Sequence, residues 1–221
     1  MPLDFYYTPV SAPCRAVLLT AKALNVSLNL KIVDLQRGDN LKPEFLKINP
    51  QHTVPTLTDN GFSISESRAI MIYLAEEYGK HSSLYPKDPK KRAVINQRLY
   101  FDMGTLYTSI YQYYLLALWL RVPRDATRKK KVDDAFTILN KYLETQTWVA
   151  GESMSLADFS TVASVSTAEV CGYNVSSYPH VARWLSTAKS AMPGYSEVNQ
   201  PGLDALTKII QSANKPLTTQ L

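Results

Sequence analysis

The alternation of hydrophobic and polar residues changes character near residue 85. In the first part of the chain, short apolar runs alternate with segments of helical spacing. Four of the runs have the length of strands: 3–7, 28–35, 53–58 and 62–65. Three segments between and after them have a helical period: 12–24, 42–48 and 66–78. The order βαβαββα predicts an α/β unit in which a parallel pair of strands is extended by a terminal hairpin.

After a proline-rich link at 85–89, only helical periodicity remains. Five segments show it: 90–121, 125–145, 156–171, 178–191 and 202–213. We therefore predict an α/β domain over residues 1–82 and an all-helical domain over residues 89–221. One helix start carries strong local signals, because Ser155 and Asp158 have the spacing of a capping box, flanked by Met154 and Phe159 as a hydrophobic staple. This pattern predicts a contribution to folding, not to catalysis.

Composition excludes several classes of protein. No apolar run approaches the roughly 18 residues that a membrane span needs, and the N-terminus lacks the pattern of a secretory signal. Two cysteines cannot form a disulfide framework, and the three histidines have no metal-ligand spacing. We therefore expect a cytoplasmic protein with reduced thiols, no membrane association and no bound metal.

The net charge of +5 is unevenly distributed. Residues 1–85 hold 8 basic and 8 acidic side chains, so the whole excess lies in the later part of the chain. Much of it falls in 87–92 and 121–131, which is typical of solvated helix ends. A continuous basic track for nucleic acid is not indicated, and we expect no nucleic-acid partner.

The most informative junction is the one between the first strand and the first helix. Ser11 falls at or near the N-cap of that helix, where unpaired amides and the helix dipole favour negative charge. The spacing Ser11-x-Pro13-Cys14 is that of a thiol-redox motif whose attacking cysteine is replaced by serine. A serine hydroxyl can donate a hydrogen bond to a thiolate that a bound cofactor supplies. The alternative interpretation is that Ser11 only caps its helix.

Two further turns have the appearance of binding sites. A cis Val54–Pro55 bond would turn the backbone of Val54 outward and leave it free to pair with an extended peptide. Glu66 and Ser67 open a helix, where amides and a hydroxyl can hold a carboxylate while Glu66 pairs with an ammonium group. The second turn is equally typical of an ordinary helix cap.

Taken together, these motifs resemble those of the cytosolic glutathione transferases over the full length of the chain, most closely those of the insect delta class. The matching segments are Asp4–Tyr7 (DFYY), Ser11–Arg15 (SAPCR), Lys47–Leu57 (KINPQHTVPTL), Glu66–Arg68 (ESR) and Gln97–Tyr107 (QRLYFDMGTLY). The resemblance implies a thioredoxin-like first domain, a helical second domain, a two-fold homodimer, and glutathione as co-substrate with no tightly bound cofactor.

The resemblance also assigns roles to individual residues. Ser11 would stabilise the glutathione thiolate. The remaining glutathione contacts would come from His52, Thr53, Val54 and Pro55 at the glycine and cysteine part, and from Glu66, Ser67 and Arg68 at the γ-glutamyl end. The chain departs from the family pattern in two places. Val10 stands where the family usually has glycine, and Asn40 stands where a histidine near the glycine end is frequent.

The second substrate is expected against the first helix of the helical domain. Four tyrosines and a glycine fall within about 80° of one another on an ideal helix: Tyr100, Gly104, Tyr107, Tyr111 and Tyr114. Such a stripe is often a core or subunit face, but Gly104 indicates a close approach by another group. The resemblance implies that this region contributes to the pocket for a hydrophobic electrophile near Tyr107 and to a subunit contact near Tyr100. The walls that we predict for the pocket are Leu35, Met103, Tyr107 and Tyr111.

These observations predict an enzyme that conjugates glutathione to hydrophobic electrophiles, in the detoxification of xenobiotics. A second hypothesis is a protein of the same fold that sequesters hydrophobic compounds with little turnover. A third is disulfide exchange through Cys14, although helical spacing places Cys14 on the inward face with Val17 and Leu18.

Overall fold

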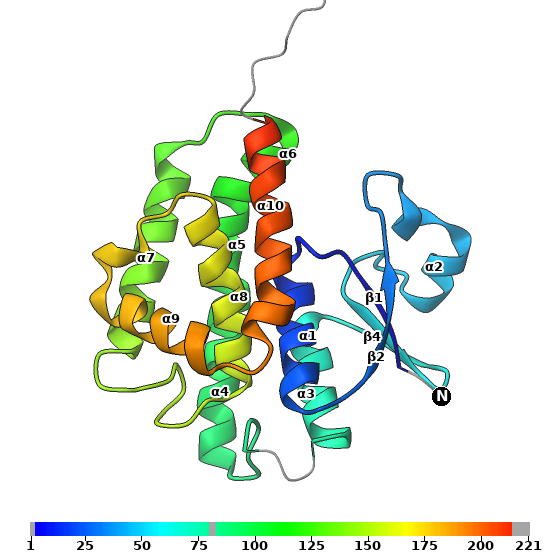
Figure 1. Ribbon diagram of the computed structural model, residues 1–221, viewed down its shortest axis with the longest axis horizontal. Helices are drawn as coiled ribbons and strands as arrows, with labels where there is room; N and C mark the ends of the chain where they lie inside the picture. Colours follow the sequence, from blue (N-terminus) through cyan, green and yellow to red (C-terminus); the bar gives the residue numbers. More distant parts are fainter. Residues whose placement is uncertain (1–2, 80–82, 214–221) are drawn as a thin grey trace, which may run out of the picture.

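The computed structural model describes residues 3–79 and 83–213, which form an α/β domain and a helical domain lying side by side (Figure 1). The element order β1-α1-β2-α2-β3-β4-α3 confirms the predicted βαβαββα unit, and helices make up the remainder. The domain boundary between residues 82 and 89 remains a proposal from the sequence. No helix in the described ranges has both the length and the apolar character needed to cross a membrane.

Four strands form one mixed sheet in the order β2-β1-β3-β4. Their bounds are β1 Leu3–Tyr7, β2 Leu28–Ile32, β3 Thr56–Asp59 and β4 Phe62–Ser65. β1 pairs in parallel with β2 and antiparallel with β3, and β3 and β4 form the predicted hairpin through Asn60 and Gly61, both with positive φ. Because β1 is followed by α1, the carboxyl ends of the parallel strands β1 and β2 lie at the edge of the sheet where α1 begins.

Helices cover both faces of the sheet. α1 (Ala12–Ala23) and α3 (Ser67–Glu77) lie between the sheet and the helical domain, whereas α2 (Pro43–Ile48) lies on the far side (Figure 1). α1 packs against α8 (Leu156–Val170) of the helical domain, with Cys14, Val17 and Leu19 fully buried. The inward orientation predicted for Cys14 is thus confirmed.

The helical domain is built around α8 (Leu156–Val170), in which every residue from Leu156 to Ala168 is buried. The helices around it are α4 (Pro89–Phe101), α5 (Thr108–Ile110), α6 (Leu116–Leu120), α7 (Ala126–Tyr142), α9 (Pro179–Ala191) and α10 (Gln200–Ala213). The capping box at the start of α8 is present as predicted, with Asp158 bound to the backbone N–H of Ser155.

The helix predicted over 90–121 is continuous, but two stretches of it are π-helical, Asp102–Tyr107 and Tyr111–Leu115. A wider turn changes which side chains share a face. The predicted tyrosine stripe is therefore divided. Tyr114 is buried in the core and Tyr100 is 68% exposed. A Cβ placed at Gly104 would have no atom of the described chain within 4 Å. The close approach expected at Gly104 is therefore not made by any group of this chain that the structure describes.

Two predicted strands are longer than the observed ones. β2 ends at Ile32 rather than at residue 35, because Asp34 leaves the sheet and accepts hydrogen bonds from the amides of Gln36 and Arg37. β3 begins at Thr56 rather than at residue 53. Proline has no N–H to donate to a ladder, so Pro55 cannot continue the strand.

Candidate active site

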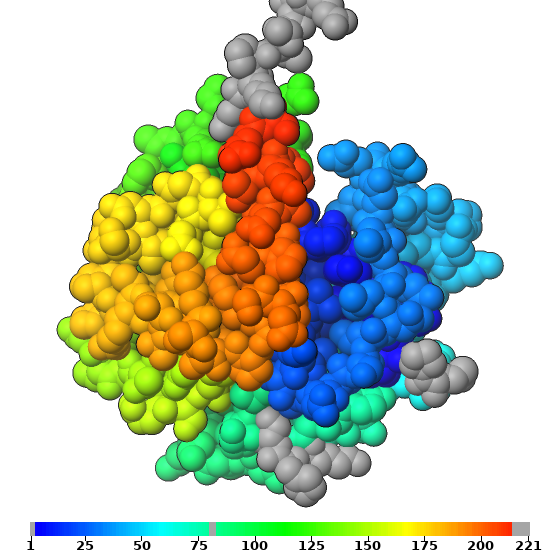
Figure 2. All heavy atoms as spheres, in the orientation of Figure 1, coloured from blue at the N-terminus to red at the C-terminus, as the bar shows by residue number. Residues whose placement is uncertain are grey.

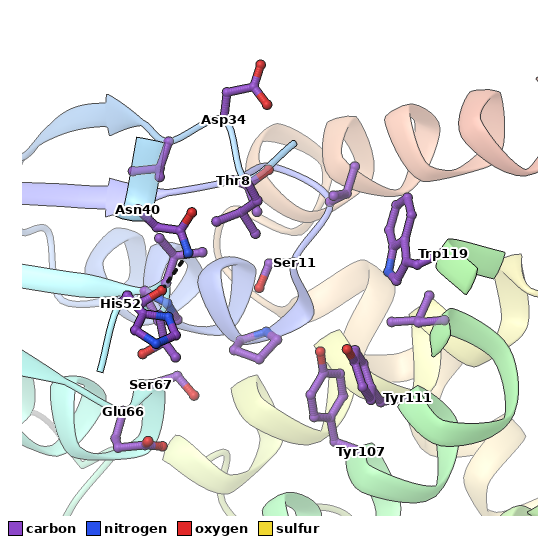
Figure 3. A pocket seen from close by; sticks show the side chains of 18 of the residues that line it. Thr8, Ser11, Asp34, Asn40, His52, Glu66, Ser67, Tyr107, Tyr111 and Trp119 are labelled. Carbon is purple, nitrogen blue, oxygen red and sulfur yellow. Dashed lines mark hydrogen bonds between the residues drawn. The ribbon is translucent and has the colours of Figure 1, made fainter. Parts of the chain in front are cut away.

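A cleft of about 960 Å³ lies where the two domains meet. In the space-filling view, the surface is hollowed between the upper part of α10 and the lobe that carries α2 (Figure 2). One wall comes from the α/β domain and is largely polar; the other comes from the helical domain and is aromatic (Figure 3). All of the predicted glutathione and electrophile residues line this cleft: Ser11, Leu35, His52, Thr53, Val54, Pro55, Glu66, Ser67, Arg68, Met103, Tyr107 and Tyr111.

Ser11 lies between the two walls, at the N-terminus of α1 (Figure 3). Its backbone is extended, its N–H donates to the carbonyl of Thr8 at 3.2 Å, and its Oγ accepts a bond of 3.4 Å from the N–H of Cys14. Ser11 therefore caps the helix, as its position in the sequence indicates. The hydroxyl proton remains available, because this capping bond uses only an oxygen lone pair.

The polar wall contains a loop whose backbone is open to the cleft. The Val54–Pro55 bond is cis, the isomer that the sequence left open, and in the described chain no group hydrogen-bonds to the N–H or C=O of Val54. Asn49, which is buried, holds the loop by donating from Nδ2 to the carbonyl of Thr53 at 3.0 Å and to Oγ1 of Thr56 at 2.9 Å. The loop therefore presents an unpaired extended residue on a fixed support.

Asn40 has a defined place in this wall. Its Nδ2 donates to the backbone carbonyl of His52 at 2.8 Å (Figure 3), and His52 has a positive φ of 48°. A positive φ is uncommon for a residue with a side chain, and the bond from Asn40 helps to maintain it. Sequence reasoning treats Asn40 as the loss of one contact, whereas the structure shows a residue that orients His52.

The start of α3 supplies the other end of the polar wall. Glu66 is exposed, with φ of 69°, and its Oε1 lies 3.4 Å from Nε2 of Gln51. Ser67 is buried as the first residue of the helix. The guanidinium of Arg68 forms an ion pair with the buried carboxylate of Asp102 and donates to Oγ of Ser67 at 3.2 Å. Arg68 thus ties α3 to the helical domain and orients Ser67.

The aromatic wall is formed by the π-helical stretches. Tyr107 and Tyr111 both project into the cleft, with ring centroids 6.2 Å apart (Figure 3). Burial raises the pKa of Tyr107 above its ordinary value, so its phenol is protonated at neutral pH. The guanidinium of Arg68 lies 6.0 Å from the centre of the Tyr107 ring, which joins the two walls.

Sequence reasoning missed three apolar residues of this wall, Leu115, Trp119 and Ile209. Leu115 and Trp119 belong to the predicted first helix of the helical domain and follow Tyr111 by four and eight residues, a spacing that places them on the same side of an ideal helix. Ile209 lies on α10, about a hundred residues further along the chain. The signal available in the sequence was this four-residue spacing, because Leu115 and Trp119 continue the side of the helix that carries Tyr111.

Comparison with known proteins identifies the family. Residues 5–82 match the N-terminal domain of glutathione S-transferases, and residues 121–190 match their C-terminal domain. A delta-class glutathione transferase from Nilaparvata lugens is 54% identical and superimposes with a TM-score of 0.94 over 96% of this chain and 100% of the other. The chain belongs to the glutathione S-transferase family. The resemblance noted to the delta class is confirmed.

Two other solved structures extend the comparison for this transferase. A Bombyx mori glutathione transferase is 42% identical, with a TM-score of 0.92 over 95% of this chain and 98% of the other. A silkworm glutathione S-transferase described as diazinon-metabolizing is 30% identical, with a TM-score of 0.87 over 94% of this chain and 100% of the other. The protein is therefore a glutathione S-transferase, and glutathione is its co-substrate.

Proposed function

We propose that this transferase holds the thiolate of glutathione at Ser11 and conjugates it to hydrophobic electrophiles bound against Tyr107. The observation that carries the proposal is the position of Ser11. Ser11 lies at the N-terminus of α1. On one side of it is the polar wall, with the open backbone of Val54, and on the other side is the wall of aromatic side chains (Figure 3).

Along the polar wall, from Glu66 to His52, the side chains and backbone groups match the polar groups of glutathione from its γ-glutamyl end to its glycine end. The γ-glutamyl ammonium group would pair with Glu66, and its carboxylate would accept bonds from Ser67 and the first amides of α3. The cysteinyl backbone would pair with the free N–H and C=O of Val54. The glycine carboxylate would lie at His52, whose orientation Asn40 supports.

Stabilisation of the thiolate would come from the Ser11 hydroxyl and the N-terminal end of α1. A thiol that titrates near about 8.5 in water can lose one or more pKa units at a helix N-terminus. Each unit corresponds to about 1.4 kcal/mol, which one charge-assisted hydrogen bond supplies. The thiol proton leaves to solvent. The sulfur electron pair then forms the carbon–sulfur bond, and the leaving group departs with the electron pair of the bond that breaks.

The electrophile would lie against Tyr107, Tyr111 and Met103, with Leu35 closing the other side of the cleft. Aromatic and apolar side chains favour hydrophobic compounds, and the tyrosine hydroxyls can meet polar substituents. The silkworm relative that is described as diazinon-metabolizing supports xenobiotic detoxification as the proposed role of this enzyme. We place it in the cytoplasm.

Replacement of the hydroxyl tests the mechanism. We expect Ser11→Ala to lower kcat/KM with an activated aryl halide by about a hundredfold, which is typical of losing one donor to a developing anion. The dissociation constant of glutathione should remain close to that of the wild type. Full activity in Ser11→Ala would contradict the proposal.

A matched control separates the hydroxyl from the cap. Asp88 caps α4 outside the cleft, accepting from the N–H of Lys91 at 2.8 Å. Asp88→Ala should lose a similar amount of stability, about 1 kcal/mol, with unchanged turnover. The sequestering hypothesis has its own signature, namely tight binding of hydrophobic compounds by the wild type without conjugation.

A further inference from the structure

Arg15 is a buried cation directly behind the Ser11 loop. Its side chain is 1% exposed, and it lies one helical turn after Ser11 on α1. Nε donates to Oδ1 of Asn199 and Nη1 to the carbonyl of Val10, both at 2.8 Å. Nη2 donates to the carbonyl of Ala163 at 3.2 Å and to Oγ1 of Thr167 at 2.5 Å. Every one of these partners is neutral.

The positive charge of Arg15 therefore has no counter-ion in the described part of the chain. Burial lowers the pKa of Arg15 to about 10, so the guanidinium stays protonated at neutral pH. The titratable groups that face it are Tyr107, Cys14, Tyr195 and Cys171. Burial raises the pKa of each of them, to about 11 for the two thiols, and all four are uncharged at neutral pH. A buried charge without a counter-ion is costly, and a nearby anion would offset that cost.

The place where an anion can arrive is the cleft. Val10, whose carbonyl Arg15 holds, lines the cleft and immediately precedes Ser11. On the other side, α10 closes over Arg15 so tightly that a Cβ at Gly202 would lie 2.4 Å from the carbonyl oxygen of Pro9 and 2.5 Å from Cδ of Arg15. This packing leaves no space for solvent between α10 and Arg15, so the field of the guanidinium toward the cleft is weakly screened.

We infer that Arg15 is a positioning residue for the glutathione thiolate: its buried charge stabilises the anion at Ser11, and its contacts hold the Pro9–Ser11 loop in place. The inference rests on the proposed position of the thiolate at Ser11. It assigns to the helical domain, through Asn199 and Gly202, a part in setting the acidity of a thiol that binds mainly to the α/β domain.

Asn199→Asp tests the charge with almost no change of shape. The new carboxylate would lie at the 2.8 Å contact with Nε of Arg15 and neutralise it. The Ser166 hydroxyl lies 3.1 Å from Nδ2 and donates to the carbonyl of Val162, and it would turn to donate to the new carboxylate. We expect the pKa of bound glutathione, measured by thiolate absorbance across a pH titration, to rise by about one unit, as loss of a nearby charge typically causes. The kcat/KM profile should shift to higher pH by the same amount, with kcat unchanged at high pH.

Asn199→Ala is the matched control, because it removes the contact and adds no charge. We expect its thiol pKa to stay close to that of the wild type, although it is less stable. Arg15→Lys should keep the thiol pKa near the wild-type value, and Arg15→Gln should raise it. An unchanged thiol pKa in Asn199→Asp would overturn the inference, as would an equal rise in Asn199→Ala, which would show a purely structural role.

The same titration separates this inference from the proposed role of Ser11. If the thiol pKa of bound glutathione rises in Ser11→Ala but not in Asn199→Asp, the Ser11 hydroxyl is the source of stabilisation and the role of Arg15 is refuted. If the thiol pKa rises only in Asn199→Asp, the role of Arg15 is supported and the stabilising hydrogen bond from Ser11 is refuted.

Discussion

Asp158 accepts four hydrogen bonds in a fully buried site. Its Oδ1 accepts from the N–H of Val149 at 2.9 Å and from Nε1 of Trp184 at 3.0 Å, and its Oδ2 accepts from the N–H and Oγ of Ser155 at 2.9 and 3.0 Å. A cap alone contributes about 1 kcal/mol. Besides capping α8, the carboxylate of Asp158 binds the loop before α8 and the tryptophan of α9, so it joins these three segments.

We expect Asp158→Ala to lower the free energy of unfolding by about 3–5 kcal/mol, because it leaves several buried donors without an acceptor. Denaturant unfolding measures the loss. Asp125→Ala is the control, since Asp125 caps the exposed start of α7 with a single bond of 2.8 Å to the N–H of Arg128. That variant should lose about 1 kcal/mol. Equal losses would show that Asp158 acts only as a cap.

Cys14 is fully buried, and this argues against the hypothesis of disulfide exchange. Burial raises the pKa of its thiol to about 11, although Ser11, Thr8 and Arg15 act in the opposite direction. Below that pH the thiol stays protonated, and a protonated thiol is a poor nucleophile. We expect no alkylation of Cys14 in the folded enzyme at pH 7–8, with labelling increasing only as the pH approaches about 11. Cys14→Ala should retain conjugating activity. A loss of that activity in the variant would restore the hypothesis of chemistry at Cys14.

At the scale of elements, two helical glycines behave in opposite ways. Gly202 lets α10 lie against Pro9 and Arg15, whereas Gly104 has open space around its Cβ position. The structural difference predicts opposite effects of the same substitution.

Gly202→Ala should lower the free energy of unfolding by about 1–3 kcal/mol, because the added methyl group overpacks the junction of α10 with the Ser11 loop. Gly104→Ala should raise it by up to about 1 kcal/mol, the usual gain in helix propensity. Thermal unfolding of both variants provides the comparison. Destabilisation by Gly104→Ala would point to a group outside this chain at that position, such as a second subunit.

At the scale of the whole molecule, we propose that the enzyme is a homodimer. The family resemblance places a subunit contact near Tyr100, and this side chain is 68% exposed on α4. In the proposed dimer, a second subunit would cover this exposed ring. We expect sedimentation to give twice the 24.8 kDa of one chain.

Tyr100→Arg should weaken this association, because a charge at an apolar contact must be desolvated. Ile138→Arg is the control, since Ile138 is a 40% exposed apolar residue on α7. It should leave the mass unchanged. A wild-type mass of one chain would contradict the proposed dimer.

Part of the basic segment at 121–131 is paired with acidic residues on its own helix. On α7, Lys129 and Lys130 pair with Asp133 and Asp134 one turn later, at 2.8 and 2.7 Å. These are the solvated helix charges that the sequence indicates. The charge that matters for chemistry is the single guanidinium of Arg15, which no net-charge argument distinguishes from the others.

The order of the elements was predictable from local patterns in the sequence, and the residues of the polar wall were predictable from those patterns together with the resemblance to the family. The strand and helix order follows from periodicity, the cap at Ser11 from its residue type, and the binding turns at Val54 and Glu66 from their position between elements. The sequence also determines which chemistry is available, since a serine replaces the attacking cysteine of a thiol motif.

The division of the tyrosine stripe and the surroundings of Arg15 were decided only by the tertiary structure. An ideal helical period places Tyr114 on one face with Tyr107 and Tyr111, whereas in the structure, with its π-helical stretches, Tyr114 lies in the core. Arg15 is buried among residues up to 184 positions away. Local spacing carries no information on contacts made across such separations, because they depend on how helices pack once the chain has folded.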